Sequence, residues 1–171
     1  MLEKSLATKL GLSELKSGIQ IIRDINGWRE NEKSIKYIWI VTIARSFVGW
    51  GGLFAIQFNE NKFREHSNEK ELVQGLFIDK NGVDKIYTKK SLDETSDVPQ
   101  LFRLNLFESN NGITLDGVGY KIRIIAPNID TFIKANNPNS EEWKRWESEI
   151  WAMGKKFARE ANDQEMISLF E

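Results

Sequence analysis

One apolar run, Ile38 to Phe58, sets the strongest limit on how this chain can fold. Its 21 residues carry a single charge, Arg45. A helix of that length could span a bilayer, but a central arginine would cost about 2.5–3.5 kcal/mol on insertion. Three glycines lie between positions 49 and 52, and β-branched and aromatic residues flank them. We therefore expect two buried strands joined by a glycine-rich turn, and no membrane span.

The strands predicted from this run are Tyr37–Ala44 and Leu53–Phe58. The first is almost continuously apolar, which is typical of a central strand covered on both faces. Val118–Ile125 alternates apolar with polar residues, which predicts an antiparallel strand with one wet face. Asn68–Gly75 begins like a capped helix and is predicted as a short helix. Further strands are predicted at Leu76–Ile78, Val83–Tyr87 and Leu101–Phe107.

The last helix is the clearest predicted element. Its capping-box-like start places Asn139 at the cap and Glu142 three residues later. One stripe at helical spacing holds Trp143, Trp146, Ile150, Met153, Phe157 and Ala161. We expect Trp39, Trp143 and Trp146 in the core. The chain is thus predicted to form a single α+β domain over residues 1–171, with a mostly antiparallel sheet of about five to seven strands and the long C-terminal amphipathic helix packed on one face.

The composition argues against several classes of function. The net charge is −1, so the basic excess of a general nucleic-acid binder is missing, and nothing favours an anionic membrane surface. The chain has no cysteine and one histidine, His66, which excludes disulfides, thiolate catalysis and a multi-histidine metal site within one chain. We expect no metal and no cofactor. Because no apolar stretch follows Met1–Lys4, we expect no signal peptide and a cytoplasmic location.

Four residues are candidates for contacts with a partner or ligand. Arg45 must be paired or reach water, and as a functional group it would bind an anion beside Trp50. Trp50 lies in the glycine-rich turn and Trp151 at the edge of the helix stripe, positions at which aromatic residues often serve binding. Asp116 is a candidate carboxylate, although an Asp-Gly pair is more typical of a turn.

The second half of the chain has a recognisable order of short motifs. A predicted strand, FRLNLFES, precedes Leu115–Gly117 and an aromatic-containing strand, GYKIRI; Asn137–Ser140 then leads into the terminal helix. This order resembles a loose group of small uncharacterised bacterial α+β proteins. The resemblance implies the same fold class and a bacterial or phage setting. It implies no activity and no site residue.

Three functions remain open from the sequence. Catalytic, nucleotide-binding and calcium-binding motifs are missing, which makes an enzyme the less expected outcome. The first hypothesis is a non-enzymatic binding or inhibitory protein, of the immunity or anti-defence type, that acts on a protein partner. The second is a small-molecule or nucleotide-binding protein that uses Arg45 and Trp50. The third is a carboxylate-dependent hydrolase with two of Asp116, Glu60, Asp79 and Asp97 in one cleft.

Overall fold

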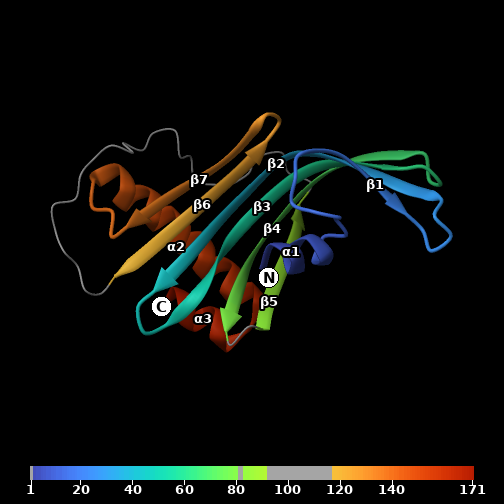
Figure 1. The fold of residues 1–171 in the computed structure, drawn as a ribbon. Helices are drawn as coiled ribbons and strands as arrows, with labels where there is room; N and C mark the ends of the chain where they lie inside the picture. Colours follow the sequence, from blue (N-terminus) through green and yellow to red (C-terminus); the bar gives the residue numbers. More distant parts are fainter. Residues whose placement is uncertain (1, 81–82, 92–116) are drawn as a thin grey trace.

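The fold is built on one large antiparallel sheet, seen face-on in Figure 1. The computed structural model describes residues 2–80, 83–91 and 117–171. Among these residues seven strands pair in the order β5-β4-β3-β2-β6-β7, and β1 pairs with β2. Their bounds are β1 Gly18–Arg23, β2 Arg29–Arg45, β3 Gly49–Lys62, β4 Ser67–Lys80, β5 Val83–Ser91, β6 Val118–Ala126 and β7 Ile129–Asn136. The predicted α+β class with a mostly antiparallel sheet is confirmed.

The centre of the sheet is the long hairpin of β2 and β3. Val41 and Ile43 of β2 pack against one face, and Ile38 and Ile40 pack against the other. The predicted central strand, covered on both faces, is therefore confirmed. One edge of β2 carries two shorter strands end to end: β1 pairs with residues 29–35, and β6 pairs with residues 38–45. Strand β7 pairs with β6 only. On the side of β1 that faces away from β2, no described strand is present.

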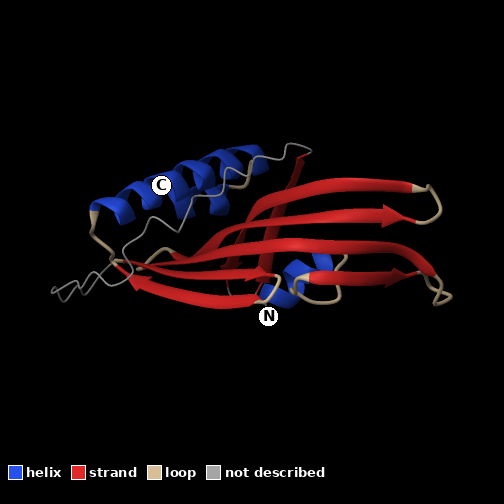
Figure 2. Cartoon of the chain, turned by 90° about the horizontal axis from the view of Figure 1, so that it is seen from above, coloured by secondary structure: helices blue, strands red, loops and turns tan. Residues whose placement is uncertain are grey.

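Helices cover both faces of the sheet, as Figure 2 shows from above. On one face α2 (Glu141–Ala161) and α3 (Gln164–Phe170) pack over β2, β3 and β4, and on the other face lies α1 (Leu2–Lys9). Each face has its own apolar core, the larger one under α2 and α3. None of the described helices is long and apolar enough to cross a membrane.

The apolar stripe of α2 is the best-predicted detail. Trp143, Trp146, Ile150, Met153 and Phe157 are all buried against the sheet, and Ala161 is partly buried. The helix begins one residue later than predicted, because Ser140 rather than Asn139 accepts the hydrogen bond from the backbone N–H of Trp143. A serine hydroxyl at this position satisfies a backbone donor that the helix itself leaves free.

Some local elements differ from the predictions, and one predicted element cannot be compared. The helix predicted at Asn68–Gly75 is wrong, because this segment belongs to β4. Its side chains alternate between the two cores, with Leu72 under α2 and Val73 under α1, and burial on both faces outweighs a cap-like start. Strand β7 and helix α3 were not predicted; most residues of β7 are exposed and lack an apolar alternation. The strand predicted at Leu101–Phe107 lies outside the described residues.

Candidate functional site

The turn between β2 and β3 presents large apolar side chains to solvent. Phe47 is 96% exposed and Trp50 is 64% exposed, and Val48 between them is also exposed. We call these three residues the β2–β3 tip. Most exposed apolar residues on a protein surface are isolated, whereas these three fall within four consecutive positions, two in the turn and Trp50 at the start of β3. The β2–β3 tip is therefore the leading candidate for a contact surface.

Backbone contacts hold this turn in one shape. The backbone N–H of Ser46 donates to the carbonyl of Gly117 (3.2 Å), and the N–H of Gly117 donates back to the Ser46 hydroxyl (3.2 Å). The N–H of Val48 donates to the carbonyl of Arg45 (3.2 Å). Phe47 has a φ of 64°, a left-handed conformation that is strained for a bulky aromatic residue and costs about 1–3 kcal/mol. Such strain at a fully exposed aromatic is a feature of functional sites.

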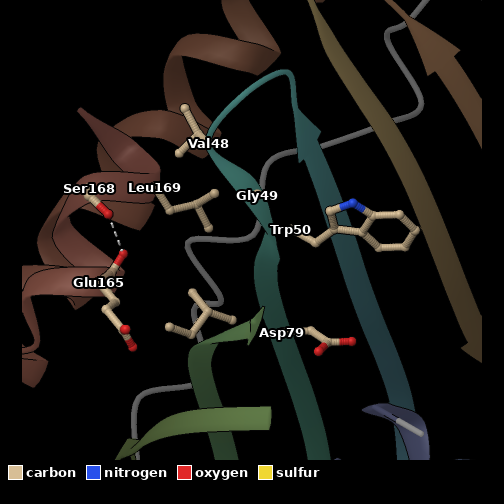
Figure 3. Close-up of a pocket in the computed structure, with 8 residues that line it drawn as sticks. Val48, Gly49, Trp50, Asp79, Glu165, Ser168 and Leu169 are labelled. Carbon is tan, nitrogen blue, oxygen red and sulfur yellow. Dashed lines mark hydrogen bonds between the residues drawn. The ribbon is translucent and has the colours of Figure 1, made fainter. Parts of the chain in front are cut away.

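Two of the four sequence-predicted residues meet in the structure. The guanidinium of Arg45 lies 5.4 Å from the ring centre of Trp151 and donates a hydrogen bond to the carbonyl of Leu169 (3.0 Å). Both are on the α2 face of the sheet. Trp50 points the other way: its side chain extends from β3 away from Leu169 (Figure 3). Arg45 and Trp50 therefore do not converge on one ligand. Asp116 lies outside the described residues.

Trp151 belongs to a partly buried polar network. Its indole N–H donates to the Tyr120 hydroxyl (3.1 Å), which in turn donates to the Glu147 carboxylate. Burial, followed by the hydrogen bond to Glu147, raises the pKa of Tyr120 well above its usual range. The tyrosine therefore stays neutral and can donate to Glu147 while it accepts from Trp151. This network explains the position of Trp151 as packing between α2 and β6, without a ligand.

We expect Tyr120→Phe to lower the free energy of unfolding by about 1–3 kcal/mol. The change keeps the ring but removes both the acceptor for Trp151 and the donor for Glu147, which leaves partly buried polar groups unpaired. Urea denaturation followed by circular dichroism measures the loss. Tyr37→Phe is the matched control, because Tyr37 packs at the margin of the same core and is expected to change stability by less than about 0.5 kcal/mol. Equal effects of the two changes would contradict the network.

The space behind the β2–β3 tip is small. A cavity of about 40 Å³ lies between the turn and α3, far below the roughly 300–1,000 Å³ of typical small-molecule sites. A wider depression of about 500 Å³ between α1 and β5 is rimmed by the exposed Lys4 and Lys9. It is open to solvent, and its Asp84 carboxylate accepts a hydrogen bond from Ser5. The first space is too small for a typical ligand, and the second is open to solvent although polar residues line most of it.

The carboxylates considered for hydrolysis are far apart where they can be compared. Asp79 pairs with Trp50 at one end of the β3–β4 hairpin, whereas Glu60 lies ten positions further along β3. At about 3.3 Å per residue the two are roughly 33 Å apart along the strand, so they share no cleft. Asp97 and Asp116 lie outside the described residues. Across the described part of the chain, no group of three or more acidic or histidine side chains is arranged to hold a metal ion.

A buried charge cluster near Glu60 was not predicted. Lys33 lies 3.9 Å from the Glu60 carboxylate, and its ammonium donates to the carbonyl of Leu10 (3.0 Å). Burial lowers the pKa of Lys33, and the charges of Glu60 and Glu71 oppose that shift. Perturbed groups of this kind occur at functional sites but also in structural networks. Here the contact with Leu10 ties the segment after α1 to the sheet, and we assign the cluster a structural role.

Comparisons with protein-family models, with curated proteins and with solved structures found no match to this chain. The glycine-rich turn predicted at residues 49–52 is wrong in position, because these residues pair with Thr42–Arg45 as the start of β3 and the chain reverses at residues 46–48. Trp50 therefore lies on a strand next to the turn and not in a loop. Nothing in the sequence marked Phe47 as exposed and strained, and that residue was missed.

Proposed function

We propose that this chain is a non-enzymatic protein-binding domain that inserts the β2–β3 tip into a pocket of a partner protein. The observation that carries the proposal is Phe47, an aromatic side chain held at positive φ and almost completely exposed. The tight turn accounts for the positive φ itself, as at His66 and Asn128 in two other hairpin turns. It does not account for an exposed phenylalanine at a position where glycine or asparagine costs less. A partner that buries the ring supplies an explanation.

The energetics of protein interfaces support this role. Large aromatic residues provide most binding hot spots, typically near the centre of a well-packed contact. The tip is also preorganised by its backbone contacts with Gly117 and Arg45, and preorganisation reduces the entropy lost on binding. A rigid apolar protrusion that fills a partner's cleft blocks that cleft. We therefore propose an inhibitory role, of the immunity or anti-defence type, as the specific form of the function.

Phe47→Gly tests the proposal because it separates binding from folding. Glycine adopts positive φ without strain, so we expect the free energy of unfolding to stay unchanged or to rise by up to about 1 kcal/mol. Binding, in contrast, should fall at least about tenfold, as expected for a hot-spot residue. The immobilised protein is used to capture partners from a lysate of the source cells, and the retained proteins are quantified by mass spectrometry.

Phe132→Ala is the matched control for the capture experiment. Phe132 is an exposed aromatic on β7, away from the tip. A specific partner should be retained by the wild type and by Phe132→Ala, and lost with Phe47→Gly and, to a smaller extent, with Trp50→Ala. If every protein retained by the wild type is retained equally by a folded Phe47→Gly variant, the proposed function is wrong.

A further inference from the structure

A second apolar surface lies at the opposite end of β2, on strand β1 and the turn that follows it. Ile19 and Trp28 are about 70% exposed (67% and 73%), Ile25 is completely exposed, and Ile21 is 40% exposed. The turn is ordered by Asp24, whose carboxylate accepts hydrogen bonds from the backbone N–H groups of Asn26 and Trp28 (both 2.9 Å). We call Ile19, Ile21, Ile25 and Trp28 the β1 patch.

Strand β1 is also an open edge. In the part of the chain that the structure describes, β1 pairs with β2 alone, so its outer backbone groups face no other strand. Its sequence, GIQIIR, has one charge, at its end, and no proline. Natural proteins usually protect such edges with lysine, proline or a bulge within the strand. The register shift of β1 lies only at Ile22/Arg23, which leaves the segment from Gly18 to Ile22 regular.

We propose that a second copy of this chain occupies this edge, through antiparallel pairing of β1 with β1. A two-fold axis at Ile21 places Ile21 opposite its copy and Ile19 opposite Arg23. Directly opposite residues project from the same face of a sheet, so the isoleucines of the two copies form one apolar stripe. No like charges face each other in this register, which makes the strand self-complementary, as an isologous interface requires.

The arrangement of rows in the sheet leaves space for this pairing. Strand β6 pairs with one half of β2, and β7 lies on the outer side of β6. Strand β1 pairs with the other half of β2, and no described strand lies on the outer side of β1. A partner's β1 would fill that space in line with β7. The turn of each copy would then approach the start of the other copy's β7, where Ile129 is also exposed. The contact would therefore cover the β1 patch together with Ile129.

The dimer would leave the β2–β3 tip free. Phe47 lies 12 positions beyond Ile35, the last residue of β2 that pairs with β1, which is about 40 Å along an extended strand. The inference is therefore independent of the proposed function. A dimer would carry two tips at distant ends of one continuous sheet, and a partner with two sites could bind both with increased avidity.

Sedimentation equilibrium of the full chain, from micromolar to hundreds of micromolar protein, tests the proposal. We expect a reversible monomer–dimer equilibrium for the wild type and a dissociation constant raised at least about tenfold by Ile21→Lys, because a lysine on an edge strand opposes pairing. Phe47→Lys is the control: it adds the same charge at the tip and should leave the dimer unchanged. Circular dichroism checks that each variant is folded.

Hydrogen exchange gives a second readout that a merely unstable variant would not reproduce. The backbone amides of β1 that point away from β2 should be protected in concentrated wild-type protein and should exchange quickly on dilution. A wild type that stays monomeric over the whole range, or a dimer that a folded Ile21→Lys variant retains, would overturn the inference. A monomer whose β1 edge is protected only by a different protein's strand would also overturn it.

Discussion

Trp146→Ala is expected to lower the free energy of unfolding by about 3–5 kcal/mol, the usual cost of removing a fully buried large aromatic. Trp146 is 2% exposed and lies at the centre of the larger core. Its ring makes edge contacts with Tyr120 and Trp143, with ring centres 5.4 Å apart in both cases. Its indole nitrogen has no hydrogen-bond partner among the described residues. The loss would therefore come from apolar packing and the cavity left behind.

Trp50→Ala is the matched control for this change. The same side chain is removed, but Trp50 is mostly exposed, so the free energy of unfolding should change by less than about 0.5 kcal/mol. Urea denaturation of both variants, followed by circular dichroism, measures the difference. If the two alanine variants lose equal stability, the assignment of one tryptophan to the core and the other to a contact surface is wrong.

The contrast between these two tryptophans shows what the sequence can predict. Trp146 belongs to a stripe with helical spacing, and such a stripe has to be buried wherever the helix packs. Its position in the core could therefore be predicted without knowing the fold. The same applies to β2, because a long apolar run needs cover on both faces.

The geometry of the candidate site depends on long-range contacts and could not be predicted in the same way. The face on which Trp50 lies is set by the register of β3 against β2 and β4. The contact between Arg45 and Trp151 joins residues far apart in the chain. The exposure of Phe47 follows from the shape of a turn that Gly117 holds in place. The glycines at 49–52 indicated a bend close to its true position at 46–48, but they did not indicate which neighbouring side chain projects from it.

Gly52→Ala is the second change with a large expected effect, a loss of about 3 kcal/mol or more in the free energy of unfolding. A Cβ atom at Gly52 would lie 1.9 Å from the carbonyl oxygen of Val41 and 2.8 Å from the ring of Phe77. Overfilling a packed core typically costs about 1–3 kcal/mol when side chains can adjust. Here the nearest atom belongs to the backbone of β2, so relief requires the two central strands to move apart.

Gly119→Ala separates this contact from the general effect of adding a methyl group to a strand. Gly119 pairs with Ala44 and Gly52 pairs with Thr42, so both glycines lie on the α1 face of the sheet. A Cβ at Gly119 would lie 3.2 Å from the end of the Asn136 side chain, and the Cβ and carbonyl oxygen of Ala44 would both lie at 3.9 Å, an ordinary van der Waals distance. Because the Asn136 side chain can rotate away, Gly119→Ala should change stability by less than about 0.5 kcal/mol. Thermal unfolding of the two variants compares them directly.

A Gly52→Ala variant as stable as Gly119→Ala would contradict the close spacing of β2 and β3 at this point. The same strand pair carries the β2–β3 tip, so the orientation of the tip would then need to be revised as well.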